Sequence, residues 1–214
     1  EMQSNINSKI NPDWLNANNA WLRAAMMETI EGIDHGCPWK WWKAPKIDLA
    51  QLQMEMVDVW HFALSHIVVI FKGDYERSVE TIMKQLDSHD SIVYFDGREY
   101  DFNEHDLLEN LELMAGLCIA RRFNVPLFMK IIEQCDLSSL ELYKQYLSKN
   151  VLNAFRQDFG YKTGEYIKIW NGREDNEHLV DIVNNKVNLN SLNAKEQIYD
   201  HLKAVYSSVS KEGA

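Results

Sequence analysis

Two pairs of acidic residues lie within long stretches of helical hydrophobic periodicity. The first pair is Glu28 and Glu31, and the second pair is Glu55 and Asp58. A spacing of three residues places both carboxylates of a pair on the same face of a helix. The residues around each pair are strongly apolar, which is typical of a helix that packs against a core. The pattern therefore predicts two long helices that carry acids close to a core.

The two stretches follow each other with only a short connection between them. We expect helices over about 16–34 and 48–73, with Asp48 as the N-cap and Gly73 as the C-cap of the second. A short connection favours antiparallel packing, which would bring the four carboxylates face to face. Such a cluster would repel itself strongly unless cations neutralised it. Oxygen ligands suit Mg²⁺ or Mn²⁺ and do not suit zinc.

The remaining chain also has mainly helical patterns. Further helices are expected over about 75–87, 104–122, 126–135, 138–157, 177–185 and 193–209. Residues 88–103 have no helical period and predict a short irregular or β-like excursion, and residues 158–176 predict an ordered loop. Nine glycines and four prolines are too few for a β-sandwich of this length. The predicted fold class is all-α, a single compact helical bundle over 1–214 with a few disordered residues at each end.

Charge and composition exclude several classes of protein. The 214 residues are 46% hydrophobic and carry 32 acids against 22 Lys and Arg, a net charge of −10. This balance argues against a nucleic-acid-binding protein, which needs a basic surface. The sequence shows no signal peptide and no apolar run long enough to cross a bilayer, so no membrane association is expected. Three scattered cysteines predict a reducing compartment, and we expect a cytoplasmic protein.

A second polar cluster lies about a hundred residues downstream of the acids. Lys149, Asn153 and Arg156 share one helical face, and this basic stripe in an acidic protein indicates a contact with an anion. The following loop extends the stripe with Tyr161, Lys162 and Lys168. A surface network of salt bridges is the alternative interpretation of the same residues.

Three tryptophans stand close together between the two acidic pairs. For Trp39 we expect a hydrophobic plug between helices. Trp41 and Trp42 could form a stacking surface for a nucleotide base, because every base has a π-face. Lys40 and Lys43 could approach a phosphate or remain solvated surface charges. His61, three residues after Asp58, is either a hydrogen-bond partner of a metal-binding carboxylate or a core residue.

Six words of this sequence, in order, resemble one known family. They are W-x6-E-T-I-E, P-W-K-W-W-K, E-M-V-D-V-W-H-F, K-N-V-L-N-A-F-R-Q, G-Y-K-T-G-E-Y and W-N-G-R-E-D-N. Their order and spacing over roughly residues 7–178 are similar to those of the dimeric, all-α dUTPases of the all-α NTP pyrophosphatase superfamily. Each word alone is weak, but the ordered set is specific.

The resemblance implies an activity, cofactors and a set of site residues. It implies hydrolysis of dUTP to dUMP and pyrophosphate by a homodimer whose site lies near the subunit interface, with dUDP as a further substrate. The implied ligands of two or three Mg²⁺ ions, for which Mn²⁺ could substitute, are Glu28, Glu31, Glu55 and Asp58. The implied phosphate and sugar contacts are Lys149, Asn153, Arg156, Tyr161 and Lys168, and Trp42 would pack near the base. We expect Glu31 to orient or deprotonate the attacking water.

The base-reading part departs from the family pattern. The family reads uracil with a Gln and an Asn in a word like L-Q-x-x-L-N, and we match it here to residues 6–11. In that alignment Asn11 fits and Asn7 replaces the Gln with a shorter side chain. A pyrophosphatase for dCTP or another pyrimidine deoxynucleotide therefore stays open. A non-catalytic helical interaction protein and a structural metal-binding bundle are the alternatives from other classes.

Overall fold

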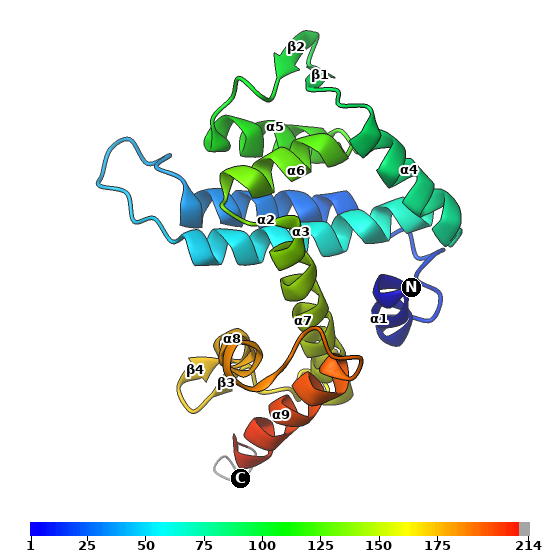
Figure 1. Cartoon of the computed structure of the whole chain (residues 1–214), viewed down its shortest axis with the longest axis vertical. Helices are drawn as coiled ribbons and strands as arrows, with labels where there is room; N and C mark the ends of the chain where they lie inside the picture. The colour runs from blue at the N-terminus through cyan, green and yellow to red at the C-terminus, as the bar shows by residue number, and fades with distance from the viewer. Residues whose placement is uncertain (210–214) are drawn as a thin grey trace. The chain divides into compact units, whose positions relative to one another are not determined.

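A computed structural model describes residues 1–209 of the chain, and its helices and strands are drawn in Figure 1. The chain divides into two compact units, one formed by Leu15–Leu142 and the other by Glu1–Trp14 with Tyr143–Ala214. Whether the two units form the single domain expected over residues 1–214 is not tested by this division, so the single domain stays a prediction. The C-terminal residues expected to be disordered lie outside the described residues. Helices dominate both units, so the predicted all-α fold class is confirmed.

The unit of Leu15–Leu142 is built around two long antiparallel helices. Helix α2 (Trp21–Gly36) runs side by side with α3 (Leu49–Ile70), and the loop between them joins neighbouring ends, as Figure 1 shows. The unit also holds α4 (Tyr75–Asp87), α5 (Leu107–Ile119) and α6 (Val125–Gln134), and α5 packs on α2. Its fully buried core includes Leu22, Leu52, Met56, Leu111, Met114, Leu117, Leu127, Phe128, Ile131 and Ile132.

The caps of these helices follow from local side-chain chemistry. The Asp48 carboxylate accepts a hydrogen bond from the Gln51 amide across 3.2 Å, so the predicted N-cap of α3 is confirmed. At the other end, the Gly73 amide donates to the Val68 carbonyl across 2.9 Å, and the Lys72 amide donates to Val69 across 3.0 Å. In this Schellman motif the C-cap is Phe71, and Lys72, with a φ of +54°, takes the first left-handed position, so the predicted C-cap Gly73 is wrong.

The stretch 88–103 contains a β-hairpin, which confirms the expected β-like excursion. Strand β1 (Ile92–Phe95) pairs antiparallel with β2 (Arg98–Asp101). The turn residues Asp96 and Gly97 both have positive φ, which matches the right-handed twist of the strands. Arg122 Nη1 donates to the Tyr94 carbonyl across 2.7 Å and fastens the hairpin to the end of α5.

The unit of Glu1–Trp14 and Tyr143–Ala214 surrounds the second half of a long helix. It holds α1 (Met2–Ile10), most of α7 (Ser139–Asp158), α8 (Asp175–Lys186) and α9 (Ala194–Val209). Strands β3 (Ile169–Trp170) and β4 (Arg173–Glu174) form a second small hairpin. Phe155 and Trp170 have no exposed surface and lie at the centre of an aromatic core with Tyr206. This core fixes the C-terminal half of α7, where the predicted anion contacts lie.

Two elements of this unit were not expected from the hydrophobic pattern. Helix α1 covers residues whose buried face is largely polar, with Gln3, Ser4 and Asn7 beside Ile6. The loop 158–176 contains the β3–β4 hairpin, whose turn is formed by Asn171 and Gly172, both with positive φ. Asn-Gly is the strongest short hairpin signal, so this sequence did hold the information for the second hairpin.

Among residues 1–209, no single helix has both the length and the apolar character required to cross a membrane. The bent pair α3 and α4, at 119° to each other, meets the length and composition criteria only when both helices are taken together.

Candidate active site

Three of the four predicted metal-binding acids come together where α2 and α3 lie side by side. Glu28 and Glu31 project from α2, and Glu55 projects from α3. One carboxylate oxygen from each lies within 4.8 Å of the others, close enough to share a metal ion. Asp58 lies one turn further along α3, outside this group of three, but its charge acts on Glu28.

Two glycines on α2 allow the close approach of the helices. Gly32 and Gly36 follow Glu28 at intervals of four residues, so the three residues lie on the same face of α2. A Cβ atom added at Gly36 would lie 2.7 Å from Leu52 Cβ, and one added at Gly32 would lie 2.9 Å from Leu52 Cδ1. Because neither glycine has a side chain, α3 packs directly on the backbone of α2 and brings Glu55 to Glu28.

The Glu28 carboxyl has an unusual protonation equilibrium. Its pKa is raised from 4.5 to about 8, first by burial and then by the negative charge of Asp58. A hydrogen bond with Glu55 and the charges of Glu55 and Glu31 raise the pKa further. Burial and the neighbouring negative charges thus act together to favour the protonated form of Glu28. A bound cation would neutralise these charges, so the acids fit a divalent metal ion.

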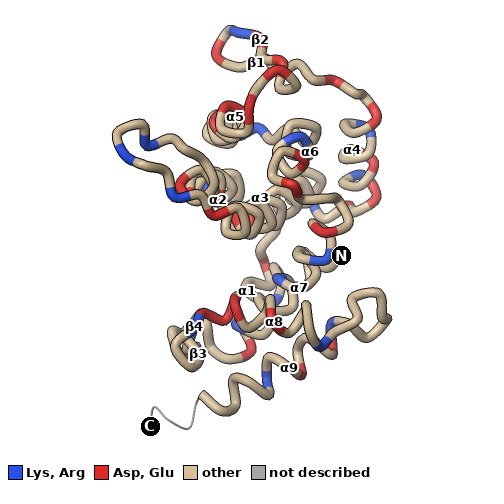
Figure 2. The backbone as a smooth tube through the Cα atoms, turned by 60° about the vertical axis from the view of Figure 1, so that its left-hand side comes forward, with Lys and Arg blue, Asp and Glu red and all other residues tan. Residues whose placement is uncertain are grey.

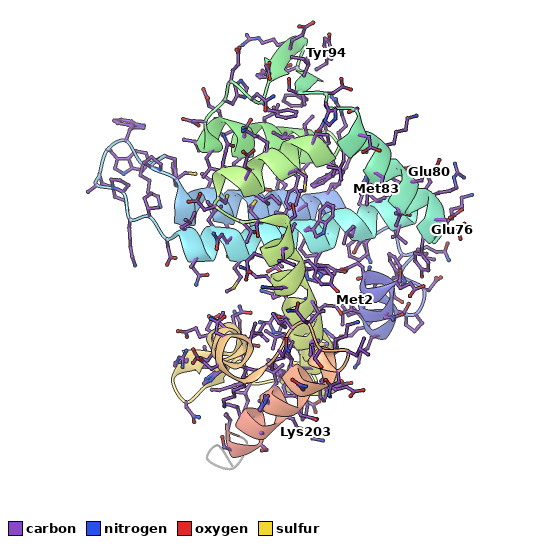
Figure 3. The ribbon with its side chains drawn as sticks, viewed as in Figure 1. Met2, Glu76, Glu80, Met83, Tyr94 and Lys203 are labelled. Atoms are coloured by element: carbon purple, nitrogen blue, oxygen red, sulfur yellow. The ribbon has the colours of Figure 1, made fainter. Side chains whose placement is uncertain are left out.

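Not every acidic pair of this protein has such an environment. Glu76 and Glu80 are four residues apart on α4, and Figure 3 shows both side chains pointing outward into solvent. Within residues 1–209, the cluster at Glu28 is the group whose carboxylates converge closely enough to hold a metal ion. An all-carboxylate set of ligands matches the preference of Mg²⁺ for oxygen. His35 lies at the edge of the cluster, with Nε2 3.9 Å from Glu55 Oε1, and belongs to the last turn of α2.

The tryptophan loop is anchored to the end of the helix that carries Glu28 and Glu31. Trp39 Nε1 donates to Asp34 Oδ1 across 2.9 Å, and Lys40 forms an ion pair with the same carboxylate. The Trp42 ring packs edge-to-face on Trp39 and Trp41, with centroids 5.5 and 5.4 Å apart. Trp39 is therefore an anchored surface residue, and the expected plug between helices is wrong.

The rings of Trp41 and Trp42 are the most exposed aromatic surfaces of this loop. Trp41 is 87% exposed and Trp42 is 57% exposed. Figure 2 shows basic residues along this loop, next to the acidic residues of α2 and α3, and they are Lys40, Lys43 and Lys46. Exposed aromatic rings next to positive charge are the kind of surface on which nucleotide bases stack.

The predicted phosphate contacts lie on α7 and in the loop after it. Lys149 is buried, Asn153 is half-buried, and Arg156 lies two turns after Lys149. Arg156 is not a free cation, because Nε and Nη2 donate to the two oxygens of Asp175, each across 2.8 Å. Its Nη1 donates to Asn153 Oδ1 across 3.3 Å, so Asn153 and Arg156 form a hydrogen-bonded pair on α7.

The loop after α7 contributes the remaining predicted phosphate contacts, and one of them packs on Arg156. The Tyr161 ring centroid lies 5.6 Å from the Arg156 guanidinium, in a cation–π contact. Lys168 is exposed and pairs with Glu174 across 3.0 Å. Lys162 Nζ donates to the Ile10 carbonyl across 2.8 Å, so Lys162 ties this loop to the end of α1.

The residues expected to read the base lie at the N-terminus. Asn7 is buried and accepts a hydrogen bond from Gln3 Nε2 across 3.1 Å. Gln3 in turn accepts from the Tyr146 hydroxyl on α7 across 3.1 Å. Asn11 caps the end of α1, and its Oδ1 accepts from the Asp13 amide across 3.0 Å. The structure thus pairs Asn7 with Gln3 and gives Asn11 a separate, local contact.

Gln3 is the site candidate that the sequence analysis missed. Residues 2–7 read M-Q-S-N-I-N and fit the word L-Q-x-x-L-N with Met and Ile in place of the two leucines. This register places a Gln at position 3 and an Asn at position 7 without any shortened side chain. The signal was present in the sequence, but it lies in a segment that we had not expected to be helical.

A helical fold with a cluster of acids between two antiparallel helices is typical of helical hydrolases that use divalent metal ions. The chain belongs to the dUTPase family, whose model matches residues 1–161. The protein is therefore a dUTP diphosphatase, a hydrolase of nucleotide metabolism. This membership argues against the interaction protein and the structural metal bundle considered above. No curated protein matches the chain.

The matched region covers the metal candidates and most of the phosphate candidates. It ends at Tyr161, so Lys168, Asp175 and the helices α8 and α9 lie beyond it. The residues beyond the match nevertheless contact those within it, because Asp175 binds Arg156 directly.

Proposed function

We propose that this dUTPase cleaves dUTP to dUMP and pyrophosphate with Mg²⁺ held by Glu28, Glu31, Glu55 and Asp58. The observation that carries the proposal is the convergence of three carboxylates within 4.8 Å, with a Glu28 pKa of about 8. Acids at this separation are costly for a protein unless a cation binds between them. Two or three ions, with Mn²⁺ as a possible substitute, match the number of carboxylates.

Glu31 is our candidate for the residue that orients or deprotonates the attacking water. It is exposed, whereas Glu28 and Glu55 are half-buried, so its carboxylate is the one most accessible to water. Bound Mg²⁺ supplies a lowered pKa for water and charge neutralisation at phosphoryl oxygens. Glu28, Glu31, Glu55 and Asp58 would hold the ion, and Glu31, the exposed member of the cluster, would also accept the proton of the water.

Lys149, Asn153, Arg156, Tyr161 and Lys168 bind the phosphates and the sugar in this proposal. Charge that develops on the phosphates during cleavage is stabilised by these N–H and O–H donors. Lys168 is paired with Glu174 on the surface, where an exposed ion pair contributes little and can be exchanged for a phosphate. Arg156 is different, because its partner Asp175 has no exposed surface.

The base is recognised by stacking on Trp42 and by amide hydrogen bonds from the N-terminal helix. Asn7 and Gln3 form a connected amide pair, and Asn11 is the further candidate from the family word. An amide group offers both a donor and an acceptor, and rotation exchanges them. Uracil and cytosine differ in this same pattern, so hydrolysis of dCTP is the alternative that the amide chemistry favours. A role for dUDP as a second substrate belongs to the same proposal.

We also propose a cytoplasmic homodimer. Met27 and Ile30 flank the acids on α2 and leave nearly half of their surfaces exposed, which supports a further protein surface beside the metal site. All three cysteines are free and buried, which supports a reducing compartment. Light scattering of the purified chain tests the dimer, and a monomeric mass at micromolar concentration would contradict it.

A panel of deoxynucleotides tests the proposed function. Pyrophosphate release from dUTP, dUDP, dCTP and dTTP is measured with Mg²⁺, with Mn²⁺ and with EDTA. We expect dUTP to be the best substrate, with activity lost in EDTA and restored by either metal. Glu31→Gln removes one of the converging carboxylates and should abolish turnover, whereas the matched variant Glu76→Gln alters a solvent-facing acid on α4 and should have full activity. Full activity of Glu31→Gln, or turnover in EDTA, would overturn the proposal.

A further inference from the structure

A buried carboxylate beyond the region matched by the family model holds the phosphate-binding arginine. Asp175, the first residue of α8, accepts two hydrogen bonds from Arg156, from Nε to Oδ2 and from Nη2 to Oδ1, each 2.8 Å long. Asp175 has no exposed side-chain surface, and the Arg156 side chain is 11% exposed. Two parallel bonds between planar groups fix both the position and the plane of the guanidinium.

Other residues hold Asp175 in its charged form. The Tyr166 hydroxyl donates to Asp175 Oδ2 across 2.8 Å, and the Asp175 amide donates to the Lys168 carbonyl across 3.0 Å. Burial alone would raise the pKa of Asp175, but the hydrogen bonds and charge of Arg156, together with the Tyr166 hydrogen bond, lower it. The position of Asp175 at the start of α8 also favours a negative charge.

We infer that Asp175 is a positioning residue for phosphate binding, which orients Arg156 and, through it, Asn153 and Tyr161. The inference rests on the proposed role of Arg156 at the phosphates. Three of the five proposed phosphate and sugar contacts belong to this one network, because Arg156 Nη1 donates to Asn153 and the guanidinium lies against the Tyr161 ring. Arg156 therefore presents a directed N–H donor to the phosphates. The positive charge of its guanidinium is balanced by the Asp175 carboxylate.

Because Asp175 lies in the C-terminal segment, this segment contributes to the orientation of Arg156. Tyr166 and Asp175 follow the matched residues 1–161 and reach Arg156 because Trp170 is buried in the aromatic core around Phe155. The Trp170 indole donates to the Ile167 carbonyl across 2.7 Å and holds the start of the β3–β4 hairpin, which Asp175 follows. The segment after residue 161 thus supplies the carboxylate that holds Arg156, which lies within the match.

Two explanations of Asp175 predict opposite changes in anion binding. If Asp175 acted only as a negative charge near the phosphates, its removal would tighten the binding of pyrophosphate and raise turnover. If Asp175 positions Arg156, its removal leaves the guanidinium free to rotate and lowers turnover. Small displacements of a binding group at a reacting centre are known to have large effects on rate.

The experiment compares Asp175→Asn with Asp181→Asn in the full chain. Asp181 is the matched control, because it lies on the same helix and also accepts a 2.8 Å bond from an arginine, Arg173, but on the surface. We expect Asp175→Asn to lower kcat/KM for dUTP by about 10- to 100-fold, as for other residues that orient a binding group. Asp181→Asn should match the unaltered chain.

A double variant separates positioning from a general structural role. If Asp175 acts through Arg156, then Asp175→Asn in an Arg156→Gln background should lower kcat/KM by no more than about twofold beyond Arg156→Gln alone. Losses that multiply would overturn the inference, as would an Asp175→Asn enzyme with full activity or tighter pyrophosphate binding and faster turnover. Circular dichroism and thermal melting set an assay temperature at which every variant is folded.

A milder variant serves if Asp175→Asn does not fold. Tyr166→Phe keeps the ring and removes only the hydroxyl that donates to Asp175. It should lower kcat severalfold, and this loss should disappear in the Arg156→Gln background. A loss that persists there would overturn the inference. If Arg156→Gln alone retained full activity, the phosphate role of Arg156 in the proposed function would fail, a result distinct from any effect of Asp175.

Discussion

Trp39 donates its indole N–H to Asp34 across 2.9 Å and thereby ties the tryptophan loop to the helix that carries Glu28 and Glu31. Lys40 pairs with the same carboxylate and also lies over the Trp39 ring, with Nζ 4.7 Å from the ring centroid. The pKa of Asp34 is lowered by the hydrogen bonds from Lys40 and Trp39, so the carboxylate is charged at neutral pH. One exposed acid thus sets the direction of a loop with three tryptophans.

Replacing Asp34 should loosen this loop without touching the metal ligands. We expect Asp34→Ala to raise the KM for dUTP severalfold and to leave kcat nearly unchanged, because loop order contributes to binding more than to chemistry. Steady-state kinetics provide the measurement, and the intrinsic tryptophan fluorescence should shift as Trp39 loses its partner. A fall in kcat with an unchanged KM would show that Asp34 acts on the metal site instead.

Trp42 should contribute directly to substrate binding. Its ring lies between Trp39 and Trp41 and is more than half exposed, so Trp42→Ala removes little from the core. Stacking of a base on an aromatic ring is worth about 1–3 kcal/mol, which corresponds to a rise in KM of about 5- to 150-fold. Trp60→Phe, in the stacked pair with Phe128, is an aromatic control away from the loop. Equal KM values for Trp42→Ala and the unaltered chain would remove Trp42 from the base site.

The metal-free protein should lose stability as the pH rises. Glu28 has a pKa of about 8 in the folded chain and an ordinary value of 4.5, so the folded state binds the proton more tightly than the unfolded state. The stabilising contribution is then complete below pH 4.5 and is lost as the pH rises toward 8. Because Glu28 is partly exposed, the loss is on the order of 2 kcal/mol at pH 8.

Thermal melting between pH 5 and pH 9 measures this dependence, first with EDTA and then with Mg²⁺. Bound metal replaces the proton, so we expect Mg²⁺ to flatten the curve above pH 7. Glu28→Gln should also flatten the curve in EDTA, because a neutral amide does not titrate. A metal-free protein whose melting temperature is constant between pH 6 and pH 8 would contradict the raised pKa of Glu28.

The helical architecture and the acidic cluster could be predicted from the sequence, because both depend on local spacing. Glu28, Glu31, Glu55 and the N-cap Asp48 follow from intervals of three or four residues and from a short connection between helices. The hairpin within 88–103 was indicated by the loss of helical period. Gln3 was missed because the buried face of α1 is polar and gives no hydrophobic signal.

Interaction partners that are far apart in the sequence could not be predicted, because no rule of local spacing pairs them. Arg156 and Asp175 are nineteen residues apart across a loop and a hairpin, and the pattern of α7 alone left both an anion contact and a network of salt bridges open for Arg156. The role of Trp39 also depends on the tertiary structure. The sequence predicted a buried residue between helices, whereas in the fold its indole donates a hydrogen bond to Asp34 at the surface. Spacing predicts which residues share a face, whereas the partner of a charge depends on the tertiary fold.

The glycine contact between α2 and α3 should govern both stability and metal binding. In an isolated helix, alanine is about 1 kcal/mol better than glycine, so Gly36→Ala would stabilise α2 on its own. In the fold, the new Cβ would lie 2.7 Å from Leu52 Cβ, an atom that cannot rotate away from the contact. We expect the clash to dominate and to lower the free energy of unfolding by about 1–3 kcal/mol. Urea unfolding in EDTA gives this value.

Gly32→Ala is the graded comparison for the same contact. At Gly32 the nearest atoms are Leu52 Cδ1 at 2.9 Å and Met56 Cε at 3.0 Å, which are the flexible ends of side chains. The loss of stability should therefore be smaller than for Gly36→Ala. Both variants push α3 away from α2, and separation of Glu55 from Glu28 should weaken Mg²⁺ binding measured by titration calorimetry. If Gly36→Ala melted at a higher temperature and bound Mg²⁺ as tightly as the unaltered chain, close helix packing would not be what assembles the acids.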